Sequence, residues 1–119
     1  MTGHRDSLET LRQRLAAFAA ERDWEQFHNP KNLAMAVSAE AGELLEHFQW
    51  LTPEQAANLP PEARAEVALE AADVLLFLVR LCDRLDIDLA AAAGKKLALN
   101  AKKYPVDKSR GKATKYDKL

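Results

Sequence analysis

Two pairs of acidic residues have the type and spacing of a metal-binding site. Glu40 and Glu43 form the first pair, and Glu70 and Asp73 form the second. Residues three apart on a helix lie on one face, with Cβ atoms about 5–6 Å apart, so each pair points to one place. Two antiparallel helices that face each other would bring the four carboxylates together. Mg²⁺ prefers such oxygen ligands and leaves positions for water and phosphate oxygens.

The residues around these acids favour a site over a plain helix surface. They are small in both motifs, at positions Ala39, Ala41, Gly42, Ala71 and Ala72. Small side chains let two helices approach and leave room for a ligand. Unpaired carboxylates beside apolar segments would repel one another and be costly to desolvate, and a cation removes that cost.

Two alternatives compete with this interpretation. Among 18 acidic residues a single Glu-x-x-Glu arises easily by chance, so ordinary solvated helix surface remains open. A di-iron carboxylate bundle would need Glu-x-x-His on two helices. Glu46 occupies the third position after Glu43, and no histidine follows Glu70 on the same helix, so the di-iron alternative is discounted.

The elements that must position these acids are predicted to be helices. The chain is rich in Ala, Leu and Glu, which favours an all-α fold. Apolar periodicity predicts a bundle of four main helices over residues 8–22, 30–48, 61–85 and 89–104, with a short helix between Thr52 and Pro60. Side chains suited to cap the helix starts are Asp6 or Ser7 (Asp6 with Glu9 as a capping box), Asn29 before Pro30, Thr52, and Asp86 or Asp88.

The composition bounds the class of protein. The chain has 119 residues, 48% of them hydrophobic and 29% charged, and a net charge of −1. These values predict one globular domain, give no reason to expect polyanion binding across the whole surface, and lead us to expect no nucleic-acid partner. No apolar run reaches about 18 residues, so we expect no membrane segment and a cytoplasmic location. Cys82, the single cysteine, lies in an apolar run and is predicted to be buried rather than reactive.

Two further regions bear on assembly and domain limits. Residues 74–79 are apolar on nearly every face, which predicts a helix at the centre of a bundle or at a subunit interface, and hence an oligomer. We assign residues 1–106 to one domain and residues 107–119 to a basic C-terminal tail. The favoured interpretation of the tail is a mobile, solvated segment. The alternative is a basic arm that closes over polyphosphate.

The acidic motifs occur within a longer pattern. Residues 18–28 (FAAERDWEQFH), 30–33 (PKNL) and 48–50 (FQW), together with Lys96, Asn100 and Lys103-Tyr104-Pro105, accompany them. Taken together, the chain from about residue 8 to 106 resembles the MazG-like nucleoside triphosphate pyrophosphohydrolases, and within them the dCTP pyrophosphatase branch. The segment between Trp50 and Glu66 is shorter than in animal members of that branch.

The resemblance implies roles for named residues. Glu40, Glu43, Glu70 and Asp73 match the family's Mg²⁺ ligands. The match implies that Lys96 contacts phosphate, that Asn100 and Tyr104 belong to the nucleotide site, and that Trp24, His28 and Trp50 hold the base. It also implies a homotetramer, assembled as a dimer of dimers.

The implied activity is Mg²⁺-dependent hydrolysis of dCTP, and of 5-modified dCTP, to the monophosphate and pyrophosphate, a housekeeping role in the nucleotide pool. The acids and Lys96 would be the catalytic residues. Two other functions stay open: hydrolysis of another canonical or damaged nucleotide such as dUTP, and a non-catalytic helical interaction module.

The residues themselves are compatible with these roles. Lys96, Asn100 and Tyr104 recur at intervals of four on one helix face, and they offer an ammonium, an amide and a phenol to a nucleotide. Trp24 and Trp50 could equally be core residues, which is the commoner use of tryptophan. Their polar neighbours favour a stacking pocket.

Overall fold

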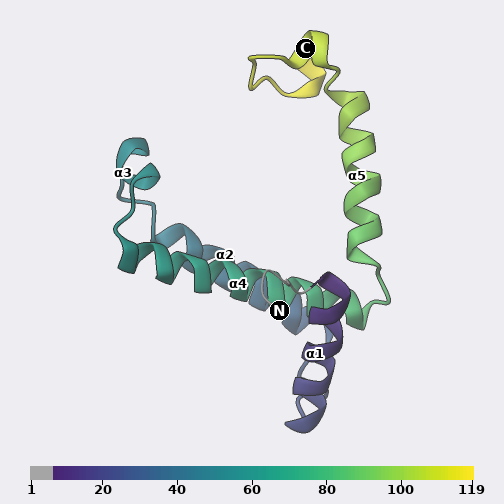
Figure 1. Cartoon of the computed structure of the whole chain (residues 1–119). Helices are drawn as coiled ribbons and strands as arrows, with labels where there is room; N and C mark the ends of the chain where they lie inside the picture. The colour runs from purple at the N-terminus through teal and green to yellow at the C-terminus, as the bar shows by residue number, and fades with distance from the viewer. Residues whose placement is uncertain (1–6) are drawn as a thin grey trace, which may run out of the picture. The chain divides into compact units, whose positions relative to one another are not determined.

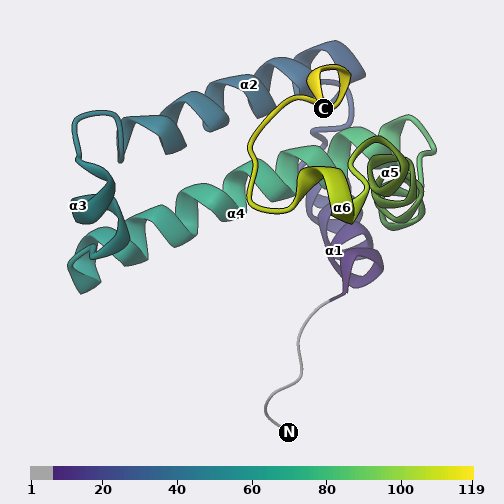
Figure 2. The same cartoon turned by 90° about the horizontal axis from the view of Figure 1, so that it is seen from above.

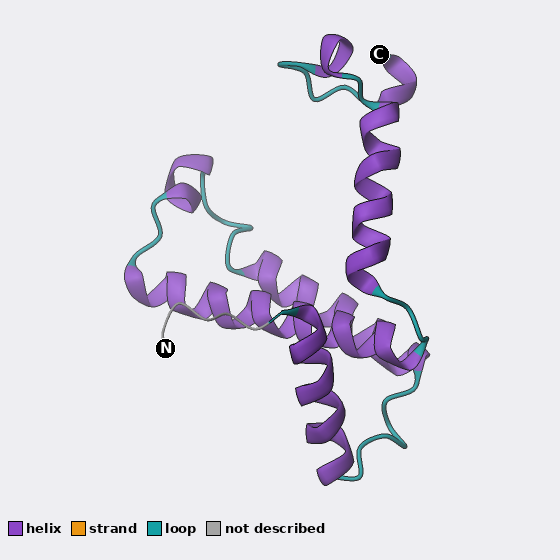
Figure 3. Ribbon diagram, turned by 45° about the vertical axis from the view of Figure 1, so that its right-hand side comes forward, coloured by secondary structure: helices purple, strands orange, loops and turns teal. Residues whose placement is uncertain are grey.

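Helices are the regular secondary structure in the part of the chain that the computed structural model describes, residues 7–119. No strand occurs in that range, as Figure 3 shows. The long helices are α1 (Leu8–Glu21), α2 (Pro30–Glu46), α4 (Pro61–Arg84) and α5 (Leu89–Lys103), and the short ones are α3 (Pro53–Ala57), α6 (Val106–Ser109) and the 3-10 turn η1 (Tyr116–Lys118). The all-α class and the four main helices are confirmed, and every long helix ends within two residues of its predicted end.

Predicted side-chain caps set the starts of α1, α2, α3 and α5, whereas α4 starts at Pro61 without one. Ser7, Asn29 and Asp88 each accept a hydrogen bond from the backbone N–H three residues ahead. Thr52 does the same, and Gln55 returns a bond to the Thr52 backbone, which completes a capping box. Asp6, the alternative cap of the first helix, lies outside the described residues. These local bonds explain why the helix starts could be predicted from the sequence.

Two helices end in a turn that redirects the chain sharply. At the end of α1, the Asp23 N–H bonds to the Ala20 carbonyl at 3.1 Å and the Trp24 N–H bonds to the Ala19 carbonyl at 2.9 Å. This is the Schellman pattern, and Asp23 adopts the positive φ of 55° that it requires. Asp86 plays the same part after α4, with the same φ. The first turn brings Trp24 back over the last turn of α1.

The chain divides into two compact units, Met1–Ile87 and Asp88–Leu119. In the first unit, α2 and α4 run antiparallel and side by side, and α1 packs against α4 (Figures 1 and 2). The antiparallel pair is joined through the short helix α3. Because α4 contacts both other long helices of this unit, it is the central element on which the acidic residues and the cavity described below are built.

The core of the first unit is small. Its buried apolar side chains are Ala19, Leu33, Val79 and Cys82. The burial predicted for Cys82 is therefore confirmed, and burial raises the pKa of its thiol. Other large apolar side chains on α2 and α4, such as Met35, Leu45 and Leu69, are more than half exposed. Within residues 74–79, predicted to be apolar on nearly every face, Leu75 is 38% exposed, so one chain covers only part of the apolar surface of α4.

The second unit consists of α5, α6 and η1. Residues 107–119, for which the sequence predicts a tail, contain most of α6 and all of η1. Tyr116 packs edge-on against Tyr104, with ring centroids 6.1 Å apart, and the Lys103 ammonium lies 4.8 Å from the Tyr116 ring centroid. The end of the chain is thus held to the end of α5, while the predicted mobility of residues 107–119 stays a prediction. No helix in the described part of the chain is long and apolar enough to cross a membrane.

Candidate metal centre and adjoining cavity

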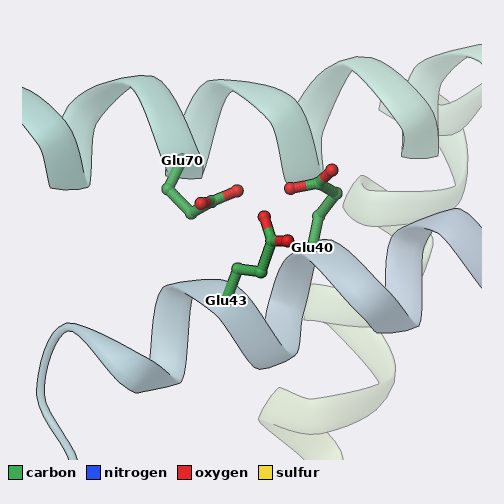
Figure 4. A group of neighbouring side chains, drawn as sticks. All are labelled: Glu40, Glu43 and Glu70. Atoms are coloured by element: carbon green, nitrogen blue, oxygen red, sulfur yellow. The ribbon is translucent and has the colours of Figure 1, made fainter.

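Three carboxylates meet between the antiparallel helices α2 and α4. Glu40 and Glu43 project from α2, and Glu70 projects from α4 toward them, as Figure 4 shows. One oxygen from each lies within 4.8 Å of the others. The spacing of three residues puts the two α2 acids on one face, and the packing of α4 supplies the third acid. The sequence-based prediction that the two motifs face each other is met for these three residues.

Glu40, Glu43 and Glu70 form an acidic cluster in which two buried oxygens lack a partner within residues 7–119. One oxygen of Glu40 and one of Glu70 are buried and have no hydrogen-bond partner among the described residues. The nearby Glu70 carboxyl, which favours a shared proton, raises the pKa of Glu40, and the Glu40 carboxyl does the same to Glu43. Buried acceptors without donors are costly, and a divalent cation with oxygen ligands would satisfy them. The donor set therefore fits a hard metal ion.

Asp73 lies beside this cluster without joining it. It is one turn after Glu70 on α4, and its charge contributes to the raised pKa of Glu40. Its side chain instead lines the cavity described next. Three of the four acids predicted to converge therefore do so, and the fourth, Asp73, lines the adjoining cavity. Gly42, which lies between the two α2 acids in the sequence, is exposed, and a Cβ added there would meet open space.

A cavity of about 440 Å³ adjoins Asp73. Its volume is within the usual range of small-molecule sites, and its lining is mostly apolar with a few charged groups. It lies between α1, the turn that follows α1, and α4, and its lining residues are Leu11, Arg14, Leu15, Phe18, Trp24, His28, Asp73, Leu76, Phe77 and Arg80. An apolar cavity beside acids that could hold a cation suits a ligand with one flat ring and one anionic end.

Aromatic rings form one wall of the cavity. Trp24 meets Phe18 edge-to-face at 5.7 Å and is tilted against His28 at 6.0 Å, both measured between ring centroids. The Schellman turn after α1 positions this wall, because it folds Trp24 back over the helix. Trp24 and His28, which the sequence predicts to share a pocket, are thus brought together.

The other predicted binding residues lie elsewhere. Trp50 follows α2, is 86% exposed and is not part of the cavity lining. Lys96, Asn100 and Tyr104 belong to the second unit, on or directly after α5, so their relation to the carboxylates stays a prediction. Within a single chain, only Trp24 and His28 of the predicted base-binding residues line this cavity.

The structure also adds a residue that sequence reasoning missed. Arg80 lines the cavity and bonds to His28, yet it stands in the apolar run 74–82. A lone charge within a run predicted to be buried is a signal that could have identified it, because such a charge must find partners inside the protein.

Comparison with known proteins agrees with this architecture. The family model described as MazG-like matches residues 35–119. The chain is 47% identical to dCTP pyrophosphatase 1 of Mus musculus and 44% identical to that of Homo sapiens, in each case over 95% of this chain and 68% of the relative. A crystal structure of a pyrophosphatase from Archaeoglobus fulgidus superimposes with a TM-score of 0.78 at 38% identity, covering 88% of this chain and 98% of that one.

Fold and site together define an all-α protein with a candidate metal centre between two antiparallel helices. The chain belongs to the MazG-like family.

Proposed function

We propose that this protein is a Mg²⁺-dependent nucleoside triphosphate pyrophosphohydrolase that converts dCTP, and 5-modified dCTP, to the monophosphate and pyrophosphate. The observation that carries the proposal is the junction at Asp73, which lies one turn from Glu70 and also lines the aromatic cavity. A base in the cavity would have its phosphates near the acids. The relatives named dCTP pyrophosphatase 1 support the choice of dCTP.

The acids would hold the metal. Glu40, Glu43, Glu70 and Asp73 form the proposed ligand set, and a bound Mg²⁺ would neutralise charge that builds on phosphate oxygens. One carboxylate of this cluster would accept the proton that the attacking water gives up. The water oxygen bonds to the α-phosphorus, and the bond to the bridging oxygen breaks to release pyrophosphate.

The remaining predicted residues complete the proposal. Lys96 would offset charge on the leaving pyrophosphate, and Asn100 and Tyr104 would contact the nucleotide. Their unit is basic, with nine Lys and Arg against three Asp between residues 88 and 119, which suits a polyanionic ligand. A cytoplasmic location is part of the same proposal.

The direct test is product analysis with purified protein. With dCTP and Mg²⁺ we expect dCMP and pyrophosphate in equal amounts, and no reaction when EDTA removes the metal. Release of inorganic phosphate in place of pyrophosphate would contradict the reaction type. Faster turnover of dUTP or of a damaged nucleotide across a panel of triphosphates would reassign the substrate, and no turnover of any triphosphate would favour the interaction module.

We also propose that the protein is a homotetramer built as a dimer of dimers. Large apolar side chains on α2 and α4, including Met35, Leu45 and Leu69, are more than half exposed, and contact with other copies of the chain would remove them from water. At micromolar concentration we expect light scattering to report about four times the chain mass of 13.3 kDa. A species of one chain mass would show that these faces are not subunit interfaces. As a check, Leu69→Glu should shift the population toward smaller species.

A further inference from the structure

Arg80 is the one buried charged side chain among the described residues, with 3% of its surface exposed. Its Nε donates a hydrogen bond to His28 Nδ1 at 3.1 Å, and its Nη1 donates to Asp83 at 3.1 Å. Its Nη2 lies 3.5 Å from a Glu25 oxygen. Arg80 therefore holds the turn that contains Glu25 and His28 against α4.

Asp83 extends this network to the first helix. Its second oxygen accepts a hydrogen bond from Arg12 on α1 at 3.1 Å. The chain of contacts thus runs from Arg12 through Asp83 and Arg80 to His28, and it leaves the Arg80 guanidinium little freedom. Buried ion pairs add little stability over well-packed apolar residues. A structural role alone therefore does not explain an arginine at this position.

The bond to His28 fixes where the imidazole carries its proton. A guanidinium has only donors and does not deprotonate in proteins, so Nδ1 must be the acceptor. Burial lowers the pKa of His28, the positive charges of Arg80 and Arg84 lower it further, and the Glu25 carboxylate acts in the opposite direction. The ring is then neutral, with its hydrogen on Nε2. Because Nδ1 is occupied, Nε2–H is the polar group that His28 can offer to a ligand in the cavity.

We propose that Arg80 is a positioning residue that locks His28 in the neutral Nε2–H form, so that the cavity presents a hydrogen-bond donor to an acceptor atom on the edge of the substrate base. Cytosine carries such acceptors in its ring carbonyl oxygen and the adjacent ring nitrogen. The identity of the base rests on the proposed function, whereas the locked imidazole does not depend on it.

The imidazole state can be read without any substrate. In protein with ¹⁵N-labelled His and Arg, the His28 signals are assigned by their loss in His28→Gln. We expect a single Nε2–H tautomer in the wild type and a ¹⁵N–¹⁵N coupling across the hydrogen bond between Arg80 Nε and His28 Nδ1. In Arg80→Met the coupling disappears and the shifts move toward the average of both tautomers. Arg84→Met removes a nearby charge on the same helix but no such bond, and it should keep the coupling. Absence of the coupling in the wild type would overturn the proposal.

The consequence for substrate is tested by a double-mutant cycle. Arg80→Lys keeps the charge but loses the planar fork that reaches His28 and Asp83 together. We expect it to lower kcat/KM for dCTP by about tenfold, mainly through KM, and to have no further effect in a His28→Gln background. An equal loss in both backgrounds would show that Arg80 acts on the fold alone. If the wild type turned over no dCTP while the ¹⁵N coupling was present, the proposed substrate would fail and the locked imidazole would stand.

Discussion

Replacing Glu43 with glutamine is expected to reduce turnover of dCTP by about a hundredfold or more while the chain stays helical. The substitution keeps the size of the side chain but removes one anionic oxygen from the acidic cluster. Loss of partners that only support a metal ligand costs about 10–100-fold, so loss of a ligand should cost at least as much. Steady-state kinetics at saturating Mg²⁺ measures the effect, and circular dichroism checks the fold.

Glu46 provides the matched control. It lies three residues after Glu43 on α2, is exposed, and is not part of the acidic cluster. Glu46→Gln should keep turnover close to that of the wild type. Asp73→Asn should resemble Glu43→Gln if Asp73 completes the metal shell from its place beside the cavity. Activity of Glu43→Gln within about tenfold of the wild type would remove Glu43 from the ligand set.

The same cluster predicts how metal-free stability depends on pH. The pKa values of Glu40 and Glu43 are raised in the folded state, so the folded protein binds protons more tightly than the unfolded chain. As pH falls through these raised pKa values toward the ordinary glutamate range, the two carboxylates take up protons and stop repelling each other. The free energy of unfolding of the metal-free protein therefore rises as pH falls through this range. Glu9 has the opposite effect on stability. The hydrogen bonds that it accepts from Arg12 lower its pKa to about 2, so its contribution is lost as pH falls toward that value.

Mg²⁺ must compete with those protons. We therefore expect the rise in Tm on adding Mg²⁺ to be larger at pH 8 than at pH 5.5, and to shrink in Glu43→Gln. Thermal unfolding with and without the metal measures both effects. A rise in Tm that is the same at both pH values would mean that the metal binds away from the acidic cluster.

Trp24→Ala is expected to raise KM for dCTP by about 10–100-fold and to narrow the preference for dCTP over dATP. Removing an aromatic face that stacks on a base costs about 1–3 kcal/mol. Stacking itself tolerates any base, so the preference must come from the close walls of the cavity and from hydrogen bonds to the base edge. Truncating Trp24 opens one wall, which should favour the larger purine. The measurement is kcat/KM for both nucleotides.

Two other aromatic substitutions separate the cavity from the surface. Phe27→Ala is the control, because Phe27 belongs to the same segment and is exposed but does not line the cavity. Trp50→Ala should act like Trp24→Ala if the base-binding prediction is correct. Since Trp50 lies outside the cavity of its own chain, such an effect would have to come through the assembled oligomer. If the ratio of kcat/KM for dCTP to kcat/KM for dATP were unchanged in Trp24→Ala, Trp24 would have only a packing role.

Local interactions explain how much of the fold could be predicted. The long helices α1, α2 and α5 each start at a cap such as Asn29 or Asp88, which bonds to a backbone group three residues away, and α4 starts at Pro61 without a side-chain cap. The pairing of Glu40 with Glu43 follows from helical periodicity alone. These features arise within one or two helical turns, so a short stretch of sequence already contains the physical cause.

The cavity and its network were decided only by the tertiary structure. Arg80 bonds to His28 across 52 positions in the chain, and Arg12 bonds to Asp83 across 71. Such contacts depend on how α1 and the turn after it pack on α4, and no local pattern encodes that packing. For the same reason, spacing could not separate Glu70, which meets the α2 acids, from Asp73, which lines the cavity one turn away. The relative rotation of two packed helices decides which of two neighbouring acids faces the partner helix.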